Sequence, residues 1–122
     1  MGERFLYRVC SREELNEAKL DGLLRGNTLD KKSGFIHLST KSQVAGVLAL
    51  FFAGRDDLVL LVVDPHKLAD DGVVKYDEAE PGVFFPHFYG PAGNFTPMPL
   101  AAVVEEHALM LEQGLHVLPF KD

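Results

Sequence analysis

A chain of 122 residues, 47% hydrophobic and 25% charged, has the length and composition of one globular domain, and we expect residues 1–122 to form it. The formal net charge of −6 argues against duplex DNA or long RNA as a partner, because phosphate backbones bind to basic surfaces. A single cysteine, Cys10, excludes an internal disulfide. The N-terminal region carries no apolar run of signal-peptide or membrane-span length, so we expect a cytoplasmic protein without a membrane partner.

The first predicted strand covers residues 5–10, where strand-forming side chains alternate with a period of two. Ser11 and Glu14 then have the spacing of a capping box, which predicts a short helix to about Leu20. Residues 22–33 are polar and punctuated by glycines, a composition typical of a loop with room for a brief strand or turn.

The clearest helix follows a predicted strand at residues 34–39. Thr40 and Gln43 repeat the capping-box spacing, and Gly54 is placed to end the helix in the left-handed conformation. The aliphatic run at residues 58–63 does not alternate, so it predicts a central strand covered on both faces. The apolar residues at helical spacing are Val44, Val47, Leu48, Phe51 and Phe52.

The last part of the chain predicts a strand at residues 73–76 and an acidic turn at residues 77–82. Apolar spacing over residues 100–111 favours a helix, although residues 103–109 also alternate with a period of two. Residues 115–120 predict a short final strand. Because strands and helices interleave irregularly, we predict an α+β fold with a mixed sheet.

The first candidate site segment is residues 34–40, Gly-Phe-Ile-His-Leu-Ser-Thr. It places His37, Ser39 and Thr40 at a strand-to-helix corner, where backbone N–H groups point outward and a ligand can approach. Two simpler interpretations stand beside this one. His37 is a core histidine whose ring nitrogens are satisfied by backbone groups, and Thr40 only caps the helix.

The second candidate segment is residues 84–91, Phe-Phe-Pro-His-Phe-Tyr-Gly-Pro, which predicts a rigid turn that presents aromatic rings and the imidazole of His87. Aromatic faces with a few polar groups suit a planar heterocycle. Its alternative is plain hydrophobic packing. Nearby, Glu78 and Glu80 are either a general base or hydroxyl-orienting group, or part of a solvated turn.

Other common sites lack their markers in this chain. The five histidines show no HxxxH or HxH spacing, so no metal site is expected. GxGxxG, Walker, GxSxG and CxxC motifs are absent, and Cys10 fits a small core residue.

Residues 34–40 and 85–91 together resemble a small bacterial family, domain of unknown function family 952. Residues 57–61, Gly114 and residues 118–119 also match its pattern, so the resemblance covers nearly the whole chain. It implies an ADP-ribosyltransferase-like fold, with small antiparallel sheets and two or three helices around a cleft that accepts NAD. No metal cofactor is implied.

The resemblance also implies roles for individual residues. In that fold the first strand offers an Arg or His to NAD, which corresponds to Arg8, and a Ser-Thr pair precedes a helix. The catalytic glutamate of the fold has no equivalent, since its position is taken by the His87 segment. We expect His37 to contact ribose or phosphate, His87 to orient a hydroxyl or act in acid–base catalysis, and Arg8 to pair with pyrophosphate. The expected NAD-binding residues are Arg8, Ser39, Thr40, Phe85, Tyr89 and Gly90, of which Phe85 and Tyr89 are aromatic walls.

Three functional hypotheses follow. The first is an NAD- or nucleotide-handling enzyme of the ADP-ribosyltransferase type. The second is a non-catalytic module that binds a nucleotide-like small molecule, which the missing glutamate favours. The third is a structural domain with packed histidines, which the two polar motifs disfavour. Transfer of an RNA 2′-phosphate fits poorly, because the chain is acidic.

Overall fold

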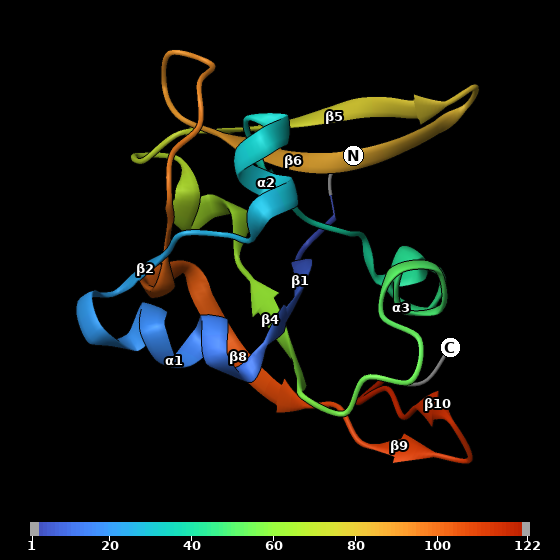
Figure 1. The fold of residues 1–122 in the computed structure, drawn as a ribbon. Coiled ribbons are helices and arrows are strands. Elements are labelled where there is room, and N and C mark those ends of the chain that lie inside the picture. The colour runs from blue at the N-terminus through green and yellow to red at the C-terminus, as the bar shows by residue number, and fades with distance from the viewer. Residues whose placement is uncertain (1–2, 121–122) are drawn as a thin grey trace.

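The computed structural model describes residues 3–120 and has an α+β fold in which all paired strands are antiparallel. Figure 1 shows the arrangement of the elements. In chain order they are β1 (Leu6–Ser11), α1 (Arg12–Asp21), β2 (Leu23–Leu24), α2 (Thr28–Ser33), β3 (Ile36–His37), η1 (Lys41–Gln43), α3 (Val44–Phe51), β4 (Leu58–Val63), η2 (Pro65–Leu68), β5 (Val73–Glu80), β6 (Val83–Tyr89), β7 (Met98–Pro99), η3 (Leu100–Ala102), β8 (Val103–Ala108), β9 (Leu111–Glu112) and β10 (Leu115–His116), where η marks a 3-10 helix.

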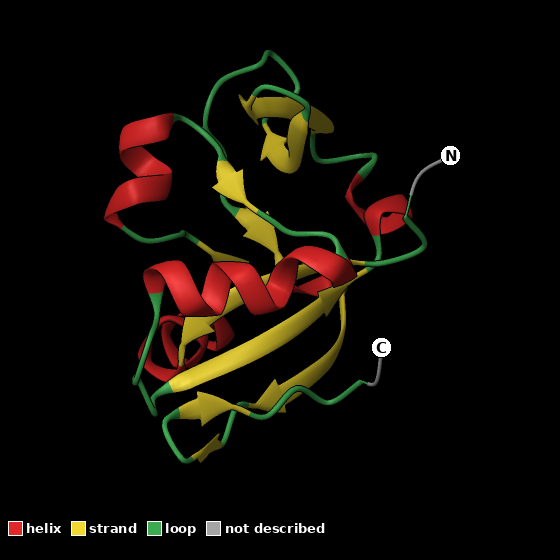
Figure 2. Cartoon of the chain, turned by 90° about the vertical axis from the view of Figure 1, so that its right-hand side faces the viewer, coloured by secondary structure: helices red, strands yellow, loops and turns green. Residues whose placement is uncertain are grey.

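The first three-stranded sheet has the order β1-β4-β8, which confirms the prediction of a central strand at residues 58–63. The alternation predicted for β1 is also confirmed. Cys10 packs in one apolar cluster with Leu15 of α1, whereas Val9 packs in another with Val44 of α3. In the view of Figure 2, α3 lies across the front of this sheet. Strand β1 therefore separates two apolar cores.

The second three-stranded sheet has the order β3-β6-β5. Its long β5–β6 hairpin runs along the top of Figure 1 and turns at Pro81 and Gly82, where Gly82 has a φ of 80°. Tyr7 and Ser39 join the two sheets through reciprocal backbone hydrogen bonds, both 2.8 Å long. This bridge brings the segment after β3 against the free edge of β1.

The helix α1 begins as its sequence predicts. Ser11 Oγ accepts a hydrogen bond of 3.0 Å from the Glu14 backbone N–H, and Gly22 ends the helix with a φ of 82°. The Glu14 side chain does not return to Ser11, because its carboxylate accepts a hydrogen bond of 2.9 Å from Arg8 instead. The capping box is therefore only half formed, and Glu14 becomes part of a buried ion-pair network.

The helix α3 follows the short η1 turn, in which the Thr40 backbone N–H donates to Gln43 Oε1 at 2.9 Å. Its buried residues are Val44 and Leu48. Phe51 belongs to the predicted apolar face but is 66% exposed. The apolar surface of α3 is therefore wider than its contact with the core.

Residues 22–33 are more regular than predicted. The brief strand is present as β2, but the segment also contains the helix α2, which Asn27 caps. Asn27 Oδ1 accepts from the Asp30 backbone N–H at 2.9 Å, and Asp30 Oδ2 accepts from the Asn27 backbone N–H at 2.7 Å. Helix α2 has no apolar stripe, so hydrophobic periodicity does not reveal it.

The predicted acidic turn at residues 77–82 is also wrong, because β5 continues to Glu80. The segment around His87 is the regular strand β6, not a rigid turn. Pro86 fits there because it lies just past the end of β3. Its carbonyl accepts a hydrogen bond of 3.1 Å from the Leu38 N–H. Because proline has no N–H, the reciprocal hydrogen bond to Leu38 is the one that is missing.

The predicted helix at residues 100–111 is the turn η3 followed by strand β8. Pairing with β4 decides the outcome, since the same residues also alternate with a period of two. The predicted strand at residues 115–120 shortens to β10, which pairs only with β9. Gln113 and Gly114 turn this hairpin with φ values of 52° and 82°, the positive pair that a tight two-residue turn requires.

Candidate functional site

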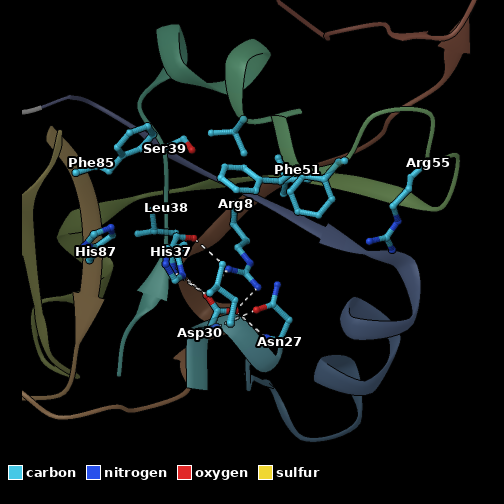
Figure 3. A pocket seen from close by; sticks show the side chains of 15 residues that line it. Arg8, Asn27, Asp30, His37, Leu38, Ser39, Phe51, Arg55, Phe85 and His87 are labelled. Carbon is cyan, nitrogen blue, oxygen red and sulfur yellow. Dashed lines mark hydrogen bonds and ion pairs between the residues drawn. The ribbon is translucent and has the colours of Figure 1, made fainter. Parts of the chain in front are cut away.

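A cleft of about 510 Å³ lies along the free edge of β1. Arg8 and Val9 both line it although they point to opposite faces of the sheet, so the cleft runs past the strand edge. Its other walls come from α2, the segment after β3, the end of α3 and the β5–β6 hairpin. Figure 3 shows His37 and His87 together on one side of it, with Phe51 and Arg55 on the other.

His37 and His87 lie directly opposite each other in the register of β3 and β6. Their ring centroids are 5.3 Å apart, and the rings meet edge to face at 70°. Phe35 stacks on the His87 ring at 3.9 Å. The two sequence motifs thus meet in one cleft.

Asp30 fixes the position of His37. Its Oδ1 accepts from the His37 backbone N–H at 2.9 Å and lies 2.7 Å from His37 Nδ1. Asp30 is completely buried. Burial alone would raise the pKa of Asp30, but the hydrogen bonds from His37 and Arg8 outweigh it and hold that pKa well below its usual range. Because an ionised carboxylate only accepts hydrogen bonds, the Nδ1 of His37 carries the proton.

Arg8 is the cation of this buried network. Its Nη1 donates to Asp30 Oδ1 at 2.9 Å and to the His37 carbonyl at 3.1 Å. Its Nη2 donates to Asp30 Oδ2 at 2.7 Å and to Glu14 at 2.9 Å. Only Nε lacks a partner among residues 3–120. The guanidinium is committed to two carboxylates, so the structure does not support its predicted pairing with a pyrophosphate.

Asp77 of β5 fixes His87 in a similar way. Its Oδ2 lies 2.7 Å from His87 Nδ1 and accepts a hydrogen bond of 2.6 Å from the Tyr89 hydroxyl. The bond from Tyr89, joined by that from His87, lowers the pKa of Asp77. Burial lowers the pKa of His87, and the opposing effect of Asp77 does not cancel it. His87 is therefore neutral at pH 7, with its Nδ1–H directed at Asp77.

The rest of the cleft is mostly apolar. Phe51 and Phe52 form a wall at the end of α3, and Phe85 lies nearer the histidines. Ser39 is the hydroxyl-bearing residue of the predicted set that reaches the cleft. Its backbone is held by Tyr7, whereas its hydroxyl makes no hydrogen bond within the described part of the chain. The cleft thus combines aromatic surface with a small polar group of histidines and a hydroxyl.

Three of the predicted binding residues lie outside the cleft lining. Thr40 belongs to the η1 turn. Gly90 closes a tight turn, with its N–H donating to the Asn94 carbonyl at 2.6 Å. Tyr89 shares the Asp77 carboxylate with His87 and does not line the cleft itself. The other five predicted site residues all line the cleft: Arg8, His37, Ser39, Phe85 and His87.

Neither predicted glutamate lines the cleft. Glu78 accepts a hydrogen bond of 2.9 Å from the Gly82 N–H in the hairpin turn, and Glu80 is exposed at the end of β5. The acidic side chains that do serve the site are Asp30 and Asp77. Asn27 and Asp30 carry a capping spacing in the sequence, so this signal was present, but Asp77 can be recognised only from strand register.

Cys10 remains a core residue. It is 1% exposed, and burial raises the pKa of its thiol to about 12. Across residues 3–120 no three His, Cys, Asp or Glu side chains are grouped as metal ligands. None of the helices in that range has the length and apolar character needed to cross a membrane.

Comparison with known proteins places these features in a family. The crystal structure of the protein CC0527 from Caulobacter crescentus, a structural genomics target, is similar with a TM-score of 0.80 and 33% sequence identity over 93% of each chain. The solution NMR structure of CC0527 is similar with a TM-score of 0.75 and 34% identity, over 92% of this chain and 90% of that one. No curated protein matches.

The family model described as protein of unknown function (DUF952) matches residues 9–106, a range that contains His37, His87 and both aspartates that hold them. The protein therefore belongs to the DUF952 family.

Proposed function

We propose that the cleft binds a nucleotide-like small molecule, with NAD as the first candidate, and that the fold is related to the ADP-ribosyltransferase-like folds. The observation that carries the proposal is the pair formed by His37 and His87. Each ring is held at Nδ1 by an aspartate, and both line one cleft beside aromatic side chains. Polar groups converging in a largely apolar cleft are typical of small-molecule sites.

The proposed roles follow from position. Phe85 lines the cleft next to the histidines and can cover one face of a planar ring. Ser39 adds a hydroxyl that can donate or accept a hydrogen bond. His37 is 34% exposed at its side chain and so is the histidine that a ligand meets first, whereas His87 is 10% exposed and lies deeper.

Transfer of an ADP-ribosyl group is the second candidate. Cleavage of the glycosidic bond to nicotinamide passes through an oxocarbenium-like state, which carboxylates commonly stabilise. Asp30 and Asp77 are used to hold the histidines, and neither Glu78 nor Glu80 lines the cleft. The neutral His87 held by Asp77 is the feature that favours catalysis, because this arrangement suits a general base.

Calorimetric titration with NAD tests the proposal. We expect saturable binding to the unmodified protein and at least about tenfold weaker binding to His37→Ala and to His87→Ala, since each removes a hydrogen-bonding group from the cleft. His66→Ala is the matched control, because His66 is exposed and lies outside the cleft. Absence of heat with NAD, ADP-ribose and simple nucleotides would refute the proposal. If NAD does bind, an assay for released nicotinamide distinguishes transfer from binding alone.

A further inference from the structure

The hydrogen-bonding groups of the two histidines indicate which chemical class of ligand the cleft binds. This inference rests on the proposed function of the cleft. In both rings Nδ1 lies 2.7 Å from an aspartate oxygen. Both aspartates accept additional hydrogen bonds, Asp30 from Arg8 and Asp77 from Tyr89, as ionised carboxylates do. In its neutral form each ring therefore carries its proton on Nδ1 and has a lone pair on Nε2.

Among residues 3–120, neither Nε2 of His37 nor Nε2 of His87 has a hydrogen-bonding partner. Neither Nε2 atom is fully buried. Both side chains line the cleft. The site thus presents two hydrogen-bond acceptors from rings whose centroids are 5.3 Å apart.

The charges around this pair do not favour an anion. Of the arginines that line the cleft, Arg8 has its guanidinium matched by two carboxylates, Asp30 and Glu14. Lys75 lies opposite His87 in the β5–β6 register but does not line the cleft. Arg55, at the other side of the cleft, is paired with Asp57 at 2.7 Å. A phosphate group offers oxygen acceptors and negative charge, so at the histidines it would meet lone pairs and no free arginine or lysine among the residues that line the cleft.

We propose that the group bound between His37 and His87 is an uncharged one with two neighbouring hydrogen-bond donors, and that phosphate is excluded from this end of the cleft. A carboxamide NH₂ and a ribose cis-diol both have this chemistry. In NAD the carboxamide lies on the nicotinamide and each ribose carries a cis-diol, so one of the two riboside halves faces the histidines and the pyrophosphate lies elsewhere.

The first test reads the tautomers directly. Long-range ¹H–¹⁵N spectra at about pH 8, above the ordinary histidine pKa of about 6.5, report which ring nitrogen carries the proton. We expect Nδ1–H in both rings, assigned by their loss in His37→Gln and His87→Gln. An Nε2–H tautomer in either ring would overturn the proposal, whether or not any ligand binds.

The second test uses matched ligands on the full-length protein. Nicotinamide is compared with methyl nicotinate, which lacks the amide donors, and adenosine with 2′,3′-dideoxyadenosine, which lacks the diol. At least one donor-bearing probe should bind about tenfold or more tightly than its partner, and the pair that shows the difference identifies amide or diol. Inorganic phosphate and pyrophosphate should not shift the Nε2 resonances.

The outcomes separate the two proposals. NAD could bind while the two ligands of each matched pair show equal affinity, or pyrophosphate could perturb both histidines. Either result would refute the proposal that the histidines bind a hydrogen-bond donor, but would leave the proposed nucleotide site intact. If no probe and no nucleotide binds, the proposed function is wrong, and so is the proposal that the histidines bind a hydrogen-bond donor. His66→Ala should behave as the unmodified protein in every titration.

Discussion

His37 and His87 are direct partners in neighbouring antiparallel strands, and each is anchored at Nδ1 by an aspartate from another element. Asp30 comes from the first turn of α2, and Asp77 comes from the middle of β5. The two anchors differ in burial, since Asp30 is completely buried and the Asp77 side chain is 39% exposed. Changes at the two aspartates should therefore have different consequences.

Asp30→Asn should destabilise the fold strongly. The change removes the charge that faces the buried Arg8 guanidinium, and breaking a buried ion pair costs about 3–5 kcal/mol. Urea unfolding followed by circular dichroism measures the loss. Asp57→Asn is the matched control, because its pair with Arg55 is exposed and is expected to contribute less than about 1 kcal/mol. Equal losses in the two variants would contradict the buried network.

Asp77→Asn should change the pKa of Tyr89 more than the free energy of unfolding. Burial and the hydrogen bond to Asp77 raise the pKa of Tyr89 to about 12. Without the carboxylate charge, that pKa should fall toward the ordinary value of about 10. Ultraviolet titration of the phenolate, with Tyr89→Phe used to subtract the other tyrosines, measures the shift. An unchanged Tyr89 titration in Asp77→Asn would show that Asp77 does not hold the hydroxyl in solution.

His87 should make the protein less stable in mild acid. Because its pKa is lower in the folded than in the unfolded chain, the unfolded chain binds more protons as the pH falls. This contribution to stability is complete above the unfolded pKa of about 6.5 and is lost as the pH falls through the lower folded pKa. Urea unfolding between about pH 7.5 and 5 measures the slope. His87→Gln should reduce it, His66→Gln should not, and the opposite ranking would refute the assignment.

Cys10 should be unreactive in the folded protein. Its thiol is buried and its pKa is raised to about 12, so thiolate is scarce and reagents cannot reach it. Alkylation by iodoacetamide, followed by mass spectrometry, should be slow in buffer and fast in urea. The result is unambiguous because the chain has one cysteine. Rapid modification under native conditions would mean that the β1 region opens readily.

Hydrophobic periodicity predicted the elements that contact the core. The alternation in β1, the unbroken apolar run of β4 and the serine N-cap of α1 lie where the sequence indicates them. Helix α3 instead ends at Phe51 with Phe52 as its C-cap, before the predicted stop at Gly54. The juxtaposition of His37 and His87 also follows from their motifs. These features were predictable because burial of an apolar face is a local pattern with a fixed period.

The anchors of the site were not predictable in the same way. Asp30 lies in a polar helix without an apolar stripe, and Asp77 lies in a segment whose acidic composition is typical of a turn. Their roles depend on partners that pairing between distant strands supplies, such as Arg8 from β1. The alternation of β8 competed with helical spacing, and only pairing with β4 resolved it.

Arg8 has a consequence for the register of β1. Side chains alternate along a strand, so a slip of one residue would turn Arg8 toward the cluster that contains Val44 and Leu48, where the buried residues are apolar. The same slip would leave the Asp30 carboxylate without its cation. A buried charge can form its ion pair in a single alignment, whereas neighbouring aliphatic residues tolerate several. Arg8 therefore favours a single register of β1 against β4, and this register also places Arg8 in the wall of the cleft.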